Sequence, residues 1–194
     1  NVLKRWLGIT CATVGFGYNL YVVCVGLFAK HNVFVVNAHN PVSKLTQQQI
    51  RDIYSGKITN WKQVGGLDEE IIPYQRNMNS GSQNFMTEFM GSTPLMDAPK
   101  EQRPASMDGL MDVIAVSDNS RQAIGFSVYA YAADMYGNGN EIKFIQVDGV
   151  APSKQSFADG TYPLMGYNYA VLRADEPDDG RVRPFVDWIL SDEG

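Results

Sequence analysis

The sequence predicts an α/β fold with mostly parallel sheets flanked by helices. Short apolar segments of strand length alternate with segments whose apolar residues recur at helical spacing. Such alternation is typical of chains in which a helix carries the chain from one parallel strand to the next. The segments with strand character are 21–25, 33–37, 70–74, 123–128, 142–147 and 167–172.

Composition and charge limit the classes of partner. The chain has 194 residues, of which 44% are hydrophobic and 19% charged, and this balance is globular. Its net charge is −5 and its pI is near 5.0. A negative field argues against nucleic acid or an anionic membrane as a partner. An anionic ligand would therefore be bound by local hydrogen-bond donors.

The first thirty residues combine membrane-like and soluble features. Trp6 to Ala29 carries no charged side chain and is long enough to suggest a membrane span. Its first half, however, is rich in glycine, threonine and other polar residues, and the segment 21–25 is β-branched. We expect a soluble strand–turn–strand, with membrane association only through a segment outside this chain. Cys11 and Cys24 form either one disulfide or two buried thiols, and both readings stay open.

Helix signals follow in chain order. Thr46 is an expected N-cap with Gln49 at the capping-box position, and that helix ends near Gly56. The segment 57–66 is predicted to be a tight loop in which Trp61 is the packing anchor. After an irregular, proline-flanked segment, further helices are expected at 107–114, 130–136, 153–158 and 182–189.

The strongest candidate site lies between the strand 70–74 and the helix that follows it. Ser80 is a good N-cap, and Gln83 three residues later completes a capping box. Gly81 allows the backbone to approach a ligand, and the amides of Gly81 and Ser82 would lie free at the positive end of the helix dipole, facing an open cleft. Arg76 adds a planar fork of donors. This pattern predicts a site for a small oxyanion, although an ordinary capped helix explains the same residues.

Metal and catalytic signals are weak. His31 and His39 are the only histidines, and their spacing is not that of a zinc site. No CxxC or HExxH motif is present, and the sequence predicts no metal and no cofactor. Ser80 and Ser82 are potential nucleophiles, but no histidine or lysine base lies near them in the motif. We therefore expect no enzyme activity.

Several of these segments together resemble the phosphate-binding proteins of ABC transporters. The matching motifs are Leu45-Thr46, Ile53-Tyr54-Ser55-Gly56-Lys57-Ile58-Thr59-Asn60-Trp61, Val64-Gly65-Gly66, Arg76 with Ser80-Gly81-Ser82, Ala123-Ile124-Gly125-Phe126, Val147-Asp148-Gly149-Val150-Ala151-Pro152 and Gly160-Thr161-Tyr162-Pro163-Leu164. They occur in the family's order over residues 31–194. The resemblance implies a periplasmic-binding-protein-like fold, type II, with two lobes and the anion between them. It also implies that Arg76, Ser80, Gly81 and Ser82 contact the ligand.

The chain departs from the family pattern in three places. The family commonly has an acidic residue two places after the arginine, where this chain has Met78, and its loss leaves Arg76 freer. No Gly-Ser/Thr turn is recognisable before residue 31, and the chain stops at Glu193-Gly194 where relatives continue. We expect an incomplete or divergent unit in which 1–40 belongs to a first lobe, 41–150 forms the second, ligand-contacting lobe and 151–194 returns to the first.

The function implied by the resemblance is solute binding. The chain would hold inorganic phosphate or a similar oxyanion for ABC-type uptake, with an ABC permease as partner. Its location would be extracytoplasmic, in the periplasm or on the outer face of a bacterial cell membrane. A sensor or adhesion module on the same fold is the alternative, and an ester-cleaving enzyme is the weakest of the three.

Overall fold

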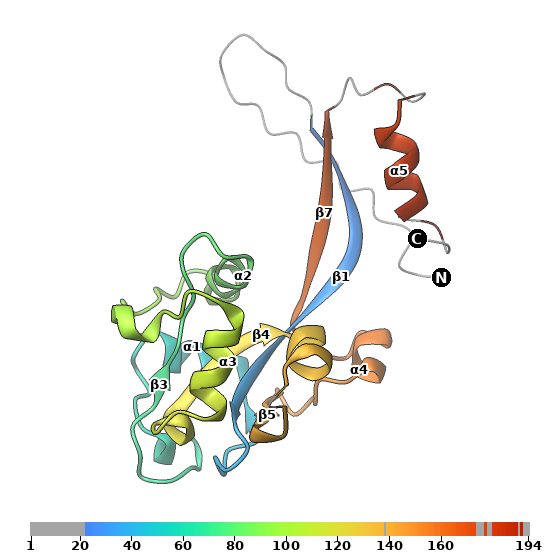
Figure 1. Cartoon of the computed structure of the whole chain (residues 1–194). Helices are drawn as coiled ribbons and strands as arrows, with labels where there is room; N and C mark the ends of the chain where they lie inside the picture. The colour runs from blue at the N-terminus through green and yellow to red at the C-terminus, as the bar shows by residue number, and fades with distance from the viewer. Residues whose placement is uncertain (1–21, 138, 174–176, 178–179, 190, 192–194) are drawn as a thin grey trace. The chain divides into compact units, whose positions relative to one another are not determined.

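The computed structural model describes residues 22–137, 139–173, 177, 180–189 and 191 (Figure 1). They fall into two compact units, of which unit 2 is the continuous stretch His31–Met165 and unit 1 holds the described residues on either side of it. The lobe boundaries expected at 40/41 and 150/151 stay predictions. The elements are, in chain order, β1 (Val22–Asn37), β2 (Lys44–Leu45), α1 (Gln47–Tyr54), η1 (Trp61–Val64), β3 (Ile72–Pro73), α2 (Gly81–Met90), η2 (Lys100–Gln102), α3 (Met107–Ala115), η3 (Ser120–Gln122), β4 (Ala123–Val128), the π-helical turn η4 (Tyr131–Met135), η5 (Gly139–Glu141), β5 (Ile142–Phe144), β6 (Gln146–Val147), α4 (Lys154–Ala158), β7 (Met165–Arg173) and α5 (Val182–Ile189).

The main sheet is mixed, which corrects the expectation of mostly parallel sheets. Its strands lie in the order β3-β4-β1-β5, and β7 also pairs with β1. Strand β1 is antiparallel to both β4 and β5, whereas β3 is parallel to β4 and the short β2 is parallel to β6. The chain enters unit 2 along β1 and leaves it along β7, which pairs with β1. Both parallel pairs, β3–β4 and β2–β6, are separated in the chain by helices, as the crossover between parallel strands requires.

Strand β1 is longer than the sequence indicates. A single strand of 16 residues, Val22–Asn37, contains 22–25 and 33–37, which the sequence predicts as parts of two separate strands. No proline and no turn dipeptide interrupts the chain between them, so the polar residues there remain extended. The expected strand 142–147 is instead divided into β5 and β6 at Ile145. Residues 1–21, including Cys11, lie outside the described residues, so the question of a disulfide does too.

One face of the main sheet is covered by α1 and α2. Phe34 in β1 pairs with Phe126 in β4, so both rings lie on this face. The ring of Tyr54 from α1 lies 6.0 Å from that of Phe34 and 5.9 Å from that of Phe126. The ring of Phe89 from α2 lies 5.4 Å from that of Phe34. These aromatic contacts attach both helices to the same side of the sheet.

The opposite face is covered by α3. Successive residues of a strand point to opposite faces. Gly125 therefore faces α3, whereas its neighbour Phe126 faces α1. A Cβ at Gly125 would stand 2.6 Å from Cδ1 of Ile114, and the missing side chain therefore lets α3 approach closely. Asn37 at the end of β1 donates from Nδ2 to the carbonyls of Ile114 and Ala115, at 3.0 and 2.9 Å. A sheet buried on both faces explains the apolar run 33–36 of β1 and the almost fully buried β4.

Two local predictions are confirmed next to this core. Thr46 Oγ1 accepts from the amide of Gln49 at 3.1 Å, and Gln49 Oε1 accepts from the amide of Thr46 at 2.9 Å, which is the complete capping box. Trp61 is 1% exposed, and its Nε1 donates to the carbonyl of Gln122 at 3.1 Å. It is the packing anchor of its loop.

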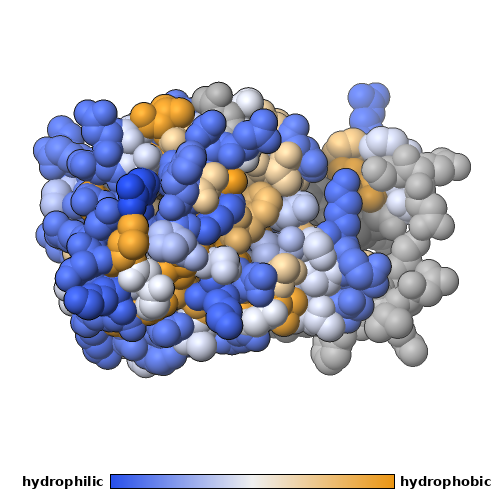
Figure 2. Space-filling model, turned by 90° about the horizontal axis from the view of Figure 1, so that it is seen from below, coloured by the Kyte–Doolittle hydropathy of each residue, from blue (hydrophilic) through white to orange (hydrophobic). Residues whose placement is uncertain are grey.

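The surface carries scattered apolar residues. Figure 2 shows a face on which hydrophilic residues predominate and hydrophobic ones form small patches. In α5, the rings of Phe185 and Trp188 are stacked with centroids 6.1 Å apart, and both side chains are exposed. None of the helices within the described residues has the length and apolar character to cross a membrane.

Candidate anion-binding site

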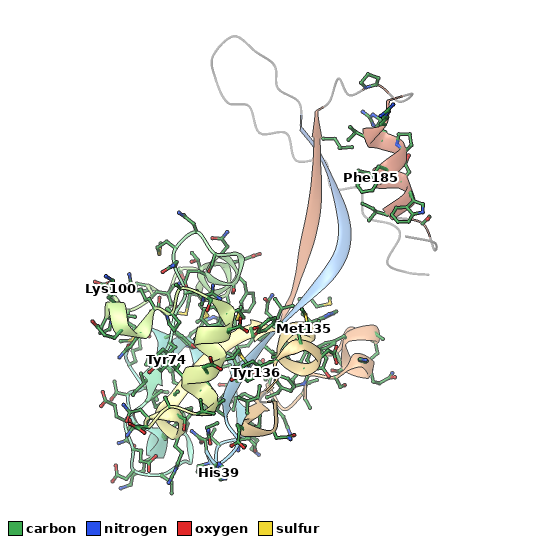
Figure 3. The ribbon with its side chains drawn as sticks, in the orientation of Figure 1. His39, Tyr74, Lys100, Met135, Tyr136 and Phe185 are labelled. Atoms are coloured by element: carbon green, nitrogen blue, oxygen red, sulfur yellow. The ribbon has the colours of Figure 1, made fainter. Side chains whose placement is uncertain are left out.

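The site begins where β3 ends. Ile72 and Pro73 pair in parallel with β4, and the amide of Tyr74 continues this ladder by donating to the carbonyl of Ile124 at 2.9 Å. Tyr74, labelled in Figure 3, lies two residues before Arg76. The carboxyl end of a parallel strand is where α/β sheets commonly place ligands. The end of β3 therefore places Arg76 at an edge of the sheet where ligands commonly bind.

The next element, α2, starts as the sequence predicts. Ser80 has extended backbone angles, φ −82° and ψ 143°, and its Oγ accepts from the amide of Gln83 at 3.2 Å. Among the described residues, the amides of Gly81 and Ser82 have no hydrogen-bond acceptor. They are donors at the positive end of the helix. That they face a cleft stays a prediction.

Gln83 does not complete the capping box, and this corrects the sequence-based expectation. Its Oε1 accepts from the backbone amide of Arg76 at 2.8 Å, whereas the amide of Ser80 donates to the carbonyl of Asn77 at 2.9 Å. Its Nε2 donates to Oε1 of Gln75 at 3.2 Å. Because Gln83 is 1% exposed, its side chain must satisfy buried partners, and the amide of Arg76 is one of them.

The guanidinium of Arg76 is buried and carries no ionic partner. Arg76 is 8% exposed, and its Nε is buried without a hydrogen-bond partner among the described residues. Nη2 donates to the carbonyl of Ala105 at 3.1 Å and Nη1 to Sδ of Met107 at 3.5 Å. No described carboxylate forms an ion pair with it. Burial lowers the pKa of Arg76, because the charged form loses solvation.

Without an acidic neighbour Arg76 has no described carboxylate partner, as expected, but its guanidinium is held in place by these two neutral contacts. Met78, at the position of that neighbour, is 69% exposed. The start of α3 takes over instead, since Ala105 and Met107 flank Ser106, the N-cap of that helix. Sequence reasoning missed both residues. The capping serine gave a signal for a helix start there, but nothing in the sequence indicated that this start lies against Arg76.

The arrangement favours an anion. A buried guanidinium without a counter-charge is costly, and a ligand with negative oxygens would satisfy Nε and offset that cost. The free amides at the start of α2 are further hydrogen-bond donors that also favour an anion. The four predicted residues thus share one region: Arg76 is tied by its backbone to Gln83, in the first turn of the helix that Ser80, Gly81 and Ser82 begin.

The histidines take no part in this region. The ring of His31 stacks on that of Phe157 at 4.0 Å, and His39 Nδ1 lies 3.2 Å from Oδ1 of Asn37. Within the described part of the chain, no cluster of three or more histidine, cysteine, aspartate or glutamate side chains could hold a metal ion.

Comparison with known proteins identifies the family. The family model of the PBP superfamily domain matches residues 23–193. The chain belongs to the PBP superfamily. Among solved structures of similar fold is an ABC-type phosphate transport receptor from Vibrio cholerae, with 30% identity and a TM-score of 0.72 over 88% of this chain and 67% of that one. A protein from Clostridium perfringens with bound phosphate, assigned to the phosphate ABC transporter substrate-binding proteins, has 26% identity and a TM-score of 0.70 over 89% of this chain and 67% of that one.

Curated relatives of this PBP-superfamily chain agree. The phosphate-binding protein PstS of Bacillus subtilis (strain 168) is 25% identical over 169 residues, which are 84% of this chain and 52% of that protein. The chain thus spans about half the length of the curated relatives it matches. The expected α/β, PBP-like fold and the resemblance to phosphate-binding proteins of ABC transporters are confirmed.

Proposed function

We propose that this PBP-superfamily chain binds inorganic phosphate, or a similar tetrahedral oxyanion, through Arg76, Ser80, Gly81 and Ser82. Binding would serve ABC-type uptake outside the cytoplasm, with an ABC permease as the partner. The names of the relatives support phosphate as the ligand.

One observation carries the proposal. Arg76 is buried, its Nε has no partner, and no carboxylate among the described residues pairs with it. Structural arginines are normally neutralised or solvated, because an isolated buried charge is unfavourable. An arginine in this state beside a helix N-terminus is matched to an anion that arrives from solution.

Binding without turnover is favoured by the state of the serines. Ser80 Oγ accepts from the amide of Gln83, so its oxygen is engaged as a helix cap. No hydrogen bond links Ser80 or Ser82 to a histidine, lysine or carboxylate side chain in the part of the chain that the structure describes. A nucleophilic serine needs such a base.

Titration calorimetry with phosphate tests the proposal. Wild type should bind, and Arg76→Ala should lose about tenfold or more in affinity, because each lost charge-assisted bond contributes about 1.5–3 kcal/mol. Arg121→Ala is the matched control, because it removes the same positive charge from unit 2. Arg121 pairs with Glu69 at 3.1 Å and takes no part in the proposed site. Equal affinity in wild type and Arg76→Ala would refute the role of Arg76, and absence of binding in wild type would refute the function.

A further inference from the structure

Gln83 joins the two sets of donors in the proposed site. We propose that Gln83 is a positioning residue, which holds the Arg76 backbone against the start of α2 so that the guanidinium and the α2 amides meet one anion. This inference rests on the proposed function and assigns a role to a side chain that contacts no ligand itself.

Three hydrogen bonds made by Gln83, and a fourth made by its partner Gln75, support this role. The Gln83 amide donates to Ser80 Oγ at 3.2 Å, and this bond fixes the first turn of α2. Its Oε1 accepts from the Arg76 amide at 2.8 Å, and its Nε2 donates to Gln75 Oε1 at 3.2 Å. The Gln75 side chain in turn donates to the carbonyl of Met96 at 2.9 Å. One residue therefore connects the helix cap to the chain segment that carries the arginine.

The chemistry of this position calls for an amide. A glutamine accepts through its oxygen and donates through its nitrogen, and both atoms are used here. An ionised carboxylate could accept from Arg76 but could not donate to Gln75. A methionine of similar length cannot donate to Gln75, and its thioether accepts only weakly. Because Gln83 is 1% exposed, water cannot replace the lost partners.

Fixing the two donor sets in advance should strengthen binding. A ligand that must order its own site pays for that ordering from its binding free energy. Second-layer hydrogen bonds that fix the binding groups remove part of this cost. Loss of the Gln83 connection should therefore weaken binding without removing any group that touches the anion.

The experiment compares three variants with wild type by phosphate calorimetry between about pH 5.5 and 8. Gln83→Met should bind phosphate about tenfold more weakly. Gln49→Met is the matched control, because Gln49 has the same N3 position in α1 and bonds only within its own cap. It should bind like wild type.

Gln83→Glu separates positioning from simple loss of structure. A protonated carboxyl can both accept and donate, so at low pH this variant should approach wild type. As the pH rises the buried carboxyl ionises next to Arg76, and affinity should fall relative to wild type. The ratio of the two dissociation constants cancels the ionisation of phosphate itself. Wild-type affinity in Gln83→Glu at every pH would overturn the proposal, as would wild-type affinity in Gln83→Met.

A second measurement keeps the inference independent of the proposed function. In phosphate-free protein, hydrogen exchange of the Arg76 amide, followed by NMR, should be faster in Gln83→Met than in wild type and in Gln49→Met. If wild type binds no phosphate but this exchange changes as expected, the function fails and the positioning of Arg76 by Gln83 stands. Unchanged exchange of the Arg76 amide overturns the inference.

Discussion

Nη1 of Arg76 lies 3.5 Å from Sδ of Met107, so the start of α3 holds the guanidinium without neutralising it. A thioether is a weak, uncharged acceptor, and the second contact is to the neutral carbonyl of Ala105. The charge of Arg76 is therefore oriented and still available. A carboxylate in the place of Met107 would orient the arginine equally well but would compete with an anion.

The first prediction tests this distinction at Met107. Met107→Glu should weaken phosphate binding about tenfold or more, because an ion pair with Arg76 offsets the charge that the ligand needs. Met107→Gln has nearly the same size and no charge, and it should bind within a few fold of wild type. Calorimetry at neutral pH measures both. Equal losses in the two variants would mean that packing, rather than charge, matters at this position.

The second prediction concerns the stability cost of Arg76. Arg76→Met removes the charge-assisted bond to Ala105, worth about 1.5–3 kcal/mol, and it also removes a buried charge that has no counter-ion, so the two effects offset each other. The free energy of unfolding in phosphate-free buffer should therefore change by less than about 1 kcal/mol, although phosphate binding is lost. Arg76→Lys should recover only part of the affinity, since one ammonium cannot replace the planar fork. Urea unfolding and calorimetry check these expectations; a large loss of stability in Arg76→Met would identify a structural arginine.

The third prediction is weak, salt-sensitive binding by this chain. An arginine fork and two or three amides contribute roughly 5–8 kcal/mol before costs. Desolvating and immobilising the ion takes several kcal/mol in return. The dissociation constant should then be about millimolar to high micromolar. It should rise with ionic strength. A submicromolar constant in calorimetry would show that donors outside Arg76 and the start of α2 complete the site.

The fourth prediction concerns pH and His31. Burial lowers the pKa of His31 from its usual 6.5. The unfolded chain therefore takes up a proton below about pH 6.5 that the folded protein resists, and stability is lost as the pH falls from 6.5 through the lower native pKa. His31→Phe retains a ring to stack on Phe157 and should remove this part of the pH dependence. Urea unfolding between about pH 5 and 7.5 measures the difference; identical pH slopes would contradict it.

The fifth prediction concerns Gly66 in the loop around Trp61. A Cβ at Gly66 would stand 2.8 Å from Cβ of Trp61 and 2.9 Å from Cγ2 of Val42. Gly66→Ala should cost about 1–3 kcal/mol of stability, as overpacking does in a core. Gly137→Ala is the control, because a Cβ there meets nothing within 4 Å. Thermal unfolding compares the two, and equal effects would show that the loop can relax.

Local features of this protein were readable from the sequence because their causes are local. The N-caps at Thr46 and Ser80 depend on residues within one helical turn, and the structure has both. The buried stretch of β1 followed from its unbroken apolar run, since a strand covered on both faces needs no polar alternation. The anion-site motif likewise required only the arginine, the serines and the glycine in order.

Tertiary structure decided the direction of the strands and the partners of the site. A strand has the same apolar pattern whether its neighbour runs parallel or antiparallel, so the reversal of β4 and β5 relative to β1 could not be seen in the sequence. The spacing of Gln83 fits a capping box, yet its side chain accepts from the Arg76 amide. A buried amide without an acceptor is unfavourable, and Gln83 supplies that acceptor. Met107 reaches the guanidinium across 31 positions of sequence, and only the packing of α3 on the sheet brings them together.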